Sequence, residues 1–265
     1  MELIAQFADW SMLAFFVLLF VCEAVGYIIG YRLGRYWRIK RGAEVEGVGL
    51  VASGILGLLT FVLALTLSYA NTRFMERRHA ALEEANAIGT AWLRAQAIDL
   101  ASAREVGKLL EEYTQQRKLF VQAHRAAAEL ENINDRTLNL QTEIWKRMTE
   151  ISHERTDPVA AALMQALNES FDLATAQRFA FEFRYPPQMF WLLLCLALIS
   201  VIALGYQFGL REQKTYVLVG VLIAVWTAVI VVILDISAPR IGSIRTGSDI
   251  YNWTLDSFKP RLQRP

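Results

Sequence analysis

The side chains that most often carry catalysis or bind metals are few in this sequence and lie far apart. The three histidines, His79, His124 and His153, have no second metal ligand at helical or loop spacing. Both cysteines, Cys22 and Cys195, lie inside apolar runs, and neither has a neighbouring base that would activate a thiol. A glycine-rich phosphate loop and a nucleophile elbow are also absent from the sequence. We therefore expect a protein that is not an enzyme and that uses no metal or other cofactor.

The most informative spacing lies in an apolar run that begins at Gly49. Small and weakly polar residues recur there every three or four positions, which places them on one face of an α-helix. Such a face has two interpretations that the sequence leaves open, a packing seam for another membrane helix or the wall of an ion pore. In the second interpretation Phe61, Leu63 and Leu67 supply apolar surface that constricts the path. The pore-lining residues are then Ser53, Gly57, Thr60, Phe61, Ala64, Ser68 and Asn71.

Two acids lie inside or at the end of apolar runs. Glu23 falls in the middle of the first run, where a charged and unpaired carboxylate is costly, so we expect it to face protein or water. It is either a neutral acid hydrogen-bonded to a neighbouring helix or an ion-binding or proton-sensing group. Asp235 lies at a membrane boundary, where it either pairs with Arg240 or caps the turn at Pro239.

Basic residues gather where the second apolar run ends. Arg73, Arg77 and Arg78 follow the run, and in a symmetric assembly they would form a ring at a pore mouth that concentrates anions. Glu83 and Glu84 come next, and we expect them to be solvated helix charges that form ion pairs at i,i+4 spacing.

Four long apolar runs position these residues. Hydrophobic residues make up 54% of the 265-residue chain, and a helix needs about 20 apolar residues to cross a hydrocarbon core. The net charge of +1 provides no basic field for nucleic acid. We therefore predict an all-α integral membrane protein with transmembrane helices at residues 12–31, 49–69, 189–210 and 216–236. The predicted divisions are a first helix pair in 1–70, a helical extramembrane domain in 71–187, a second helix pair in 188–238 and a tail in 239–265.

The segment between the second and third runs has the composition of helices throughout. The second run continues without a breaker to about residue 98, and a further helix begins near residue 102. A third helix covers about 135–154, and a fourth opens with Asp157 and Pro158, the N-cap and first-turn pair typical of a helix start.

The first run contains a small-residue stripe of its own. Gly26, Gly30 and Gly34 recur at four-residue spacing, which predicts a helix neighbour at close approach.

Four spans place both termini and the helical domain on the same side of the membrane. The basic residues near the membrane ends are equally numerous on the two sides, so they leave the orientation open. The first helix taken alone, with Glu2 and Asp9 before it and an arginine-rich loop after it, favours an outward N-terminus.

Two segments resemble the bacterial bestrophin-like membrane proteins. They are GLLTFVLALTLSYANTRFMERRHAALEEANAIGTAWLRA, with the arginine-rich loop before it, and LDISAPRIG at the end of the last run. The likeness is specific in residues 57–95 and 233–242. The chain is more distantly similar to bestrophins, whose second helix runs through an apolar, phenylalanine-containing stretch into an arginine-aromatic exit. Here Thr72, Arg73 and Phe74 occupy that exit.

The resemblance implies a pentamer-like homo-oligomer in the bacterial inner (plasma) membrane. It further implies that small anions cross through a central pore lined by the second helix, with Phe61 and the residues one and two turns on forming the neck. By the same likeness the helical domain lies in the cytoplasm. This sequence departs from bestrophins because it lacks an acidic calcium-clasp run and has a single phenylalanine in the neck region.

We accordingly expect a passive channel for small inorganic ions whose partners are membrane lipid and further copies of itself. The alternative is a membrane-anchored sensor or scaffold whose helical domain binds a partner protein. A transporter is a third possibility, although inverted repeats and broken helices are not evident in the sequence.

Overall fold

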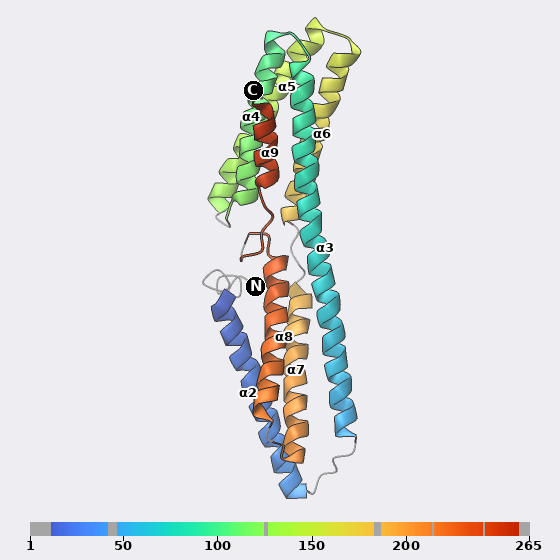
Figure 1. Ribbon diagram of the computed structural model, residues 1–265, viewed down its shortest axis with the longest axis vertical. Coiled ribbons are helices and arrows are strands. Elements are labelled where there is room, and N and C mark those ends of the chain that lie inside the picture. The colour runs from blue at the N-terminus through green and yellow to red at the C-terminus, as the bar shows by residue number, and fades with distance from the viewer. Residues whose placement is uncertain are drawn as a thin grey trace, which may run out of the picture. The chain divides into compact units, whose positions relative to one another are not determined.

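The computed structural model describes residues 12–41, 47–124, 127–182, 187–213, 215–240 and 242–259. Every regular element in these ranges is an α-helix (Figure 1), which confirms the predicted all-α class. The helices are α2 (Met12–Arg41), α3 (Val48–Gln96), α4 (Ala101–Gln122), α5 (Ala127–Glu154), α6 (Pro158–Glu182), α7 (Pro187–Arg211), α8 (Tyr216–Ser237) and α9 (Asp249–Phe258).

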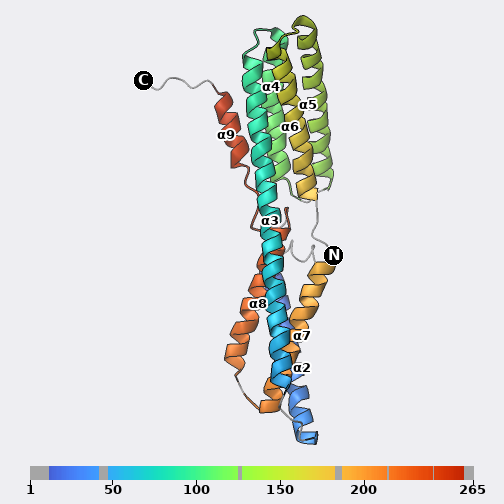
Figure 2. The ribbon, with the colours of Figure 1, turned by 90° about the vertical axis from the view of Figure 1, so that its right-hand side faces the viewer.

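The chain divides into two compact units. Unit 1 comprises Met1–Thr72 and Arg184–Ile244, and unit 2 comprises Arg73–Phe183 and Arg245–Pro265. The long helix α3 is continuous and contributes to both, as the two views in Figures 1 and 2 show. The second apolar run therefore continues into the helical domain without a break, as predicted.

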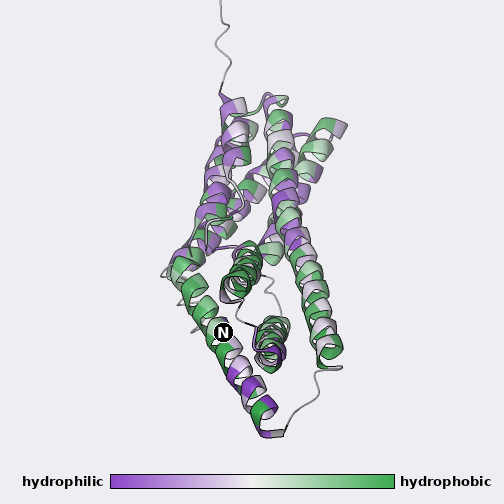
Figure 3. Ribbon diagram, turned by 60° about the horizontal axis from the view of Figure 1, so that its bottom comes forward, coloured by the Kyte–Doolittle hydropathy of each residue, from purple (hydrophilic) through white to green (hydrophobic). Residues whose placement is uncertain are grey.

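Unit 1 contains the helices that are apolar and long enough to cross a membrane. Among the described residues there are four candidate spans, in α2, in α3, in the stretch Pro158–Arg211 that includes α7, and in α8. Hydrophobic residues predominate along α7 and α8, whereas the helices of unit 2 mix hydrophilic and hydrophobic residues (Figure 3). The prediction of four transmembrane helices is confirmed, and the chain is an integral membrane protein.

Helices α2 and α7 approach each other until their backbones are in contact. A Cβ atom on Gly30 would clash with the carbonyl oxygen of Ile202, and one on Gly205 would clash with the carbonyl oxygen of Tyr27. Only glycine permits so close an approach at these positions. The close neighbour predicted from the glycine stripe is therefore α7.

The core of unit 1 joins all four membrane helices. Phe15 of α2, Leu59 of α3, Leu193 of α7, and Ile230 and Ile233 of α8 are buried together in one apolar cluster. Helix α3 enters this cluster with a single face, so most of its surface in unit 1 stays uncovered.

Unit 2 is a helical bundle with its own core. Ile88, Leu110, Ile144, Leu167 and Tyr251 are buried there, one from each of α3, α4, α5, α6 and α9. The last of these helices lies in the segment that sequence analysis treated as a tail, and the structure groups it with the helical unit.

Helix boundaries in unit 2 follow the local signals where these are strong. Helix α6 begins at Pro158, as predicted, and Asp157 caps it by accepting hydrogen bonds from the backbone N–H groups of Val159 and Ala160, each at 3.0 Å. The Ala160 N–H and the Arg155 guanidinium lower the pKa of Asp157. Helix α5, in contrast, begins at residue 127, whereas the predicted start was near 135. The prediction was wrong because no capping residue marks the start of this helix in the sequence.

Candidate functional site

Unit 1 leaves one face of α3 open. The opposite face is buried through Ala52, Leu59, Leu63, Thr66 and Ala70, which lie at three-, four- and seven-residue intervals. The described helices of the same chain do not cover the small-residue face, so it is available to lipid or to another copy. All seven predicted pore-lining residues are exposed: Ser53, Gly57, Thr60, Phe61, Ala64, Ser68 and Asn71.

The open surface of α3 has two sides of different character. Consecutive residues turn by about 100° around a helix, so the small and polar residues form one stripe and Leu58, Leu65 and Tyr69 form a bulky apolar stripe beside it. Phe61 lies at the border and is 60% exposed. Leu63, which was expected to constrict the pore with Phe61, is buried in the core of unit 1, and that expectation is wrong because Leu63 lies on the opposite face.

The threonine hydroxyls on α3 are bonded to their own helix. Thr60 Oγ1 donates to the carbonyl oxygen of Leu56 at 3.0 Å, and Thr72 Oγ1 donates to that of Ser68 at 3.0 Å. Each hydroxyl proton is therefore satisfied within the helix, and the oxygen lone pairs remain available on the open face.

The three arginines beyond the second span differ in exposure. Arg78 is exposed, and Arg73 is half-buried. Arg77 is only 2% exposed, with its guanidinium 5.8 Å from the centre of the Phe74 ring. Burial and the neighbouring Arg73 lower the pKa of Arg77. Of the three, Arg78 offers the most accessible positive charge.

Glu23 of α2 faces protein, between membrane helices. Its side chain is 1% exposed, and its Oε2 atom lies 2.8 Å from the Thr227 hydroxyl of α8. Its second oxygen, Oε1, has no hydrogen-bond partner among the described residues. The carboxyl group thus makes one polar contact across a helix interface.

Asp235 fixes the chain that follows α8. Its carboxylate accepts hydrogen bonds from the backbone N–H of Ser243 at 2.8 Å, from the Ser243 hydroxyl at 2.6 Å and from the Ile244 N–H at 3.4 Å. Gly242 has a φ of +88° and lies against the carboxylate, where a Cβ atom would clash. These contacts hold the segment at Ser243 and Ile244, which lies beyond the turn at Pro239 where a cap was expected.

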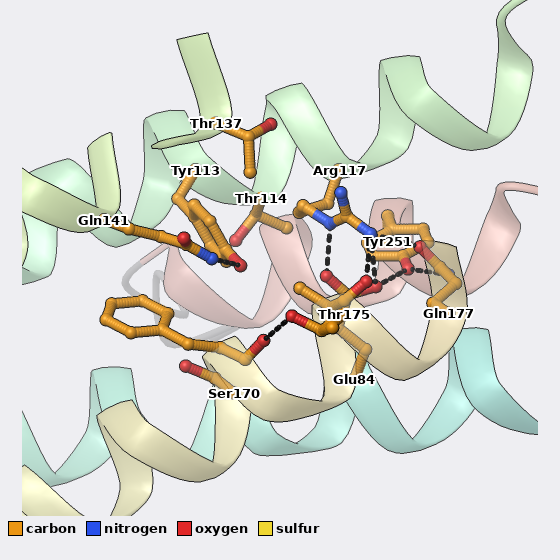
Figure 4. Close-up of polar contacts among 12 residues, drawn as sticks. Glu84, Tyr113, Thr114, Arg117, Thr137, Gln141, Ser170, Thr175, Gln177 and Tyr251 are labelled. Atoms are coloured by element: carbon orange, nitrogen blue, oxygen red, sulfur yellow. Dashed lines mark hydrogen bonds and ion pairs between the residues drawn. The ribbon is translucent and has the colours of Figure 1, made fainter. Parts of the chain in front are cut away.

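A buried polar network in unit 2 was missed by sequence analysis (Figure 4). Arg117 of α4 donates through Nε to Glu84 of α3, and its Nη2 donates to Gln177 Oε1 of α6 at 2.6 Å. The Tyr251 hydroxyl of α9 donates to Glu84 Oε2 at 2.7 Å and accepts from Gln177 Nε2 at 2.6 Å. The network therefore joins four helices that are distant in the sequence.

The charges in this network are shielded from solvent and compensated by each other. The Arg117 side chain is 2% exposed and that of Glu84 is 0% exposed. Burial acts to lower the pKa of Arg117, but the Glu84 carboxylate, together with Tyr113 and Tyr251, raises that pKa above its ordinary value. Burial and the same carboxylate raise the pKa of Tyr251 well above its ordinary value, so its hydroxyl stays protonated and donates.

The expectation that Glu84 is a solvated helix charge is therefore wrong. A local signal does distinguish it from its neighbour Glu83, which pairs with His79 on the exposed surface. Glu84 lies three residues after Ala81 and four before Ile88, on the stripe that forms the core face of α3. An acid on such a stripe needs a buried partner.

Comparison with known proteins identifies the family of the sequence and solved structures with a similar fold. The sequence model described as Bestrophin-like domain matches residues 15–251. No curated protein sequence matches the chain. A crystal structure of a bacterial bestrophin homolog from Klebsiella pneumoniae is 15% identical, with a TM-score of 0.68 over 94% of this chain and 97% of that one. Structures of two single-residue variants of that homolog are each 14% identical. Their TM-scores are 0.71, with 94% of this chain covered, and 0.70, with 91% covered, and each match covers 97% of the homolog.

Proposed function

Because this chain belongs to the bestrophin-like family, we propose that it is a homo-oligomeric ion channel whose α3 helices line a central pore for small anions. Fold-level similarity alone does not specify function, so the proposal depends on what the exposed face of α3 offers to an ion. We propose further that the assembly is a pentamer in a bacterial inner membrane, as the family resemblance implies.

The open small-residue face of α3 is the observation that carries the proposal. Copies of α3 that meet around a common axis would turn this face inward, because the opposite face is already occupied by the core of unit 1. Its glycine and alanine positions leave room along the axis, since a Cβ atom on Gly57 would meet nothing within 4 Å. Ser53, Thr60 and Ser68 supply weak polar groups at successive turns, and such groups hold an ion loosely enough to let it leave.

Phe61 is the narrowest point of the proposed path. Its ring is the largest side chain among the seven pore-lining residues and is 60% exposed in the single chain. An apolar ring of this kind gates a channel by dewetting or selects ions by how readily they lose hydration water. A smaller side chain at this position should widen the path.

Arg78 is the group best placed to favour anions. It follows Asn71 by seven residues, which is about two helical turns, so it continues the pore-lining face beyond the membrane span. A ring of Arg78 side chains raises the local concentration of anions through its positive potential. Arg73 and Arg77 lie on other sides of α3 and contribute less in this arrangement.

Halide flux into liposomes tests the channel. We expect purified protein to conduct chloride, Phe61→Ala to raise the flux, and Arg78→Gln to shift the selectivity toward cations. Leu65→Ala is the matched control for Phe61→Ala, because Leu65 lies four residues on, on the bulky apolar side of α3. If flux is absent at every pH, calcium concentration and voltage tested, the channel proposal fails and a membrane-anchored scaffold becomes the better hypothesis.

Thiol accessibility tests the pore face separately from conduction. In a background in which Cys22 and Cys195 are replaced by alanine, Thr60→Cys should react with a charged, membrane-impermeant thiol reagent, and the reaction should reduce halide flux. Leu65→Cys should not react, because lipid would cover it. Equal protection of both positions would show that α3 does not face a water-filled pore.

A further inference from the structure

Glu23 lies at an interface of α2 and α8 where a charged carboxylate has no compensation. Residues 12–31, 48–69, 187–210 and 216–234 cover the membrane-spanning parts of α2, α3, α7 and α8, and none of them is a lysine, arginine or histidine. Glu23 itself is the only acid in these ranges. With 1% of its surface exposed, it is also shielded from the bulk solvent that would stabilise a charge.

The two short contacts of the Thr227 hydroxyl indicate how many protons the site holds. Thr227 Oγ1 lies 2.8 Å from Glu23 Oε2 and 2.8 Å from the carbonyl oxygen of Ile223. A threonine hydroxyl has one proton and donates one hydrogen bond, whereas a carboxylate and a carbonyl group are both acceptors. Thr227 alone therefore cannot satisfy both contacts. Both are satisfied if Glu23 carries a proton on Oε2 and donates it to Thr227, while Thr227 donates to Ile223.

We propose that the Glu23–Thr227 pair is a proton-binding site in which a neutral carboxylic acid fastens α2 to α8. The second oxygen, Oε1, is then an uncharged carbonyl oxygen, which tolerates the absence of a partner far better than a carboxylate oxygen does. Loss of the proton turns the contact into two acceptors competing for one hydroxyl, beside a buried charge. The contact between α2 and α8 then opens.

No other titratable group in the membrane-spanning parts of α2 or α8 supplies a charge that would compensate an ionised Glu23. On α2 itself, Tyr27 lies one turn from Glu23, and its buried hydroxyl also has no hydrogen-bond partner among the described residues. On α8, Tyr216 and Asp235 lie about 16 Å and 12 Å from Thr227 along the helix, and Asp235 is engaged by Ser243 and Ile244.

The other two helices add no charge to the site. Helix α7 contributes Cys195, Tyr206 and, at its end, Arg211, while α3 has no titratable side chain between Val48 and Ser68. The proton is therefore held by one group.

Infrared spectroscopy observes this proton directly and does not require conduction. We expect the full-length protein at neutral pH to show the C=O stretching band of a protonated carboxylic acid, shifted in D2O and lost in Glu23→Gln. Glu131→Gln, which alters an exposed acid on α5, is the control and should keep the band. In Thr227→Val the band should remain but move to the frequency of a less strongly hydrogen-bonded acid.

Stability as a function of pH supplies a second readout. There is a pH range in which Glu23 stays protonated in the folded protein but is ionised in the unfolded chain. Over that range the equilibrium constant for unfolding should rise tenfold per pH unit. The Glu23→Gln variant carries an amide that donates to Thr227 at every pH, so this variant should lose that dependence. A wild-type spectrum without a band that Glu23→Gln removes would overturn the proposal. Should Glu23→Gln fail to fold, a band unmoved by Thr227→Val would overturn it equally, whereas a moved band would support it.

Discussion

Replacing Arg117 with methionine removes the donor at the centre of the buried network in unit 2. The guanidinium donates to Glu84, to Gln177 Oε1 at 2.6 Å and to the Ala174 carbonyl oxygen at 3.3 Å, and methionine supplies none of these hydrogen bonds. Methionine fills a similar volume, so the main effect is electrostatic. The Glu84 carboxylate stays buried without its cation.

The expected loss follows from the burial of both partners. Breaking a buried ion pair by removal of one partner costs about 3–5 kcal/mol, because the remaining charge is uncompensated. For a chain of this size, each kcal/mol corresponds to roughly 2–4 °C in Tm, so Arg117→Met should lower the Tm by roughly 6–20 °C. Thermal unfolding of the purified protein in detergent, followed by circular dichroism, measures this change.

A double variant separates loss of the pair from loss of packing. Glu84→Gln in the Arg117→Met background removes the stranded charge while its amide oxygen still accepts from Tyr251. The double variant should therefore be more stable than Arg117→Met alone. If the two substitutions instead destabilise additively, Arg117 and Glu84 do not act as a pair, and the reasoning from the network is refuted.

Three further predictions concern single contacts. Gly30→Ala should destabilise the protein by about 1–3 kcal/mol, because the new methyl group meets the α7 backbone. The control Gly220→Ala places its methyl group in open space and should leave the stability unchanged. Equal Tm values for the two variants would contradict the α2–α7 packing. Tyr251→Phe leaves Gln177 Nε2 without its acceptor and should lower the free energy of unfolding by about 1–3 kcal/mol. Faster proteolysis of α9 is the readout. Unchanged proteolysis would show that this hydroxyl does not hold α9 in place. Because the pKa of Asp157 is lowered in the folded state, its stabilising effect is present above the unfolded pKa and lost as the pH falls. Asp157→Asn should flatten the acid side of the stability profile, and an unaltered profile would rule out this contribution.

The membrane part of the fold could be predicted because its signals are local. The length of each apolar run fixes a span, and the spacing from Gly26 to Gly34 predicts a close neighbour on one face. The identity of that neighbour, α7, could not be predicted, because nothing near Gly30 in the sequence refers to Ile202. Similarly, the sequence shows the small-residue stripe on α3, but only the packing of Leu59 and Leu63 shows that the stripe faces away from the core of its own chain.

The helical unit was harder to predict where partners are distant. Glu84 is 33 residues from Arg117 and 167 from Tyr251, so no helical spacing connects them. Helix α9 is short, and its buried residues, Tyr251 and Phe258, find their partners on other helices. A ten-residue helix has little stability in isolation, which explains why its local sequence gives a weak signal.

The hydrogen bond of the Thr60 hydroxyl to its own helix has a consequence for a newly synthesised chain in the bilayer. Hydrocarbon offers no acceptor for a free hydroxyl proton, but Thr60 already directs its own to the carbonyl oxygen of Leu56, one turn back. In a single, unassembled chain the Thr60 position can therefore lie against acyl chains without an unsatisfied hydroxyl proton. In the proposed homo-oligomeric channel, assembly therefore need not coincide with synthesis, and the Thr60 hydroxyl can rotate toward water once the stripe faces the pore.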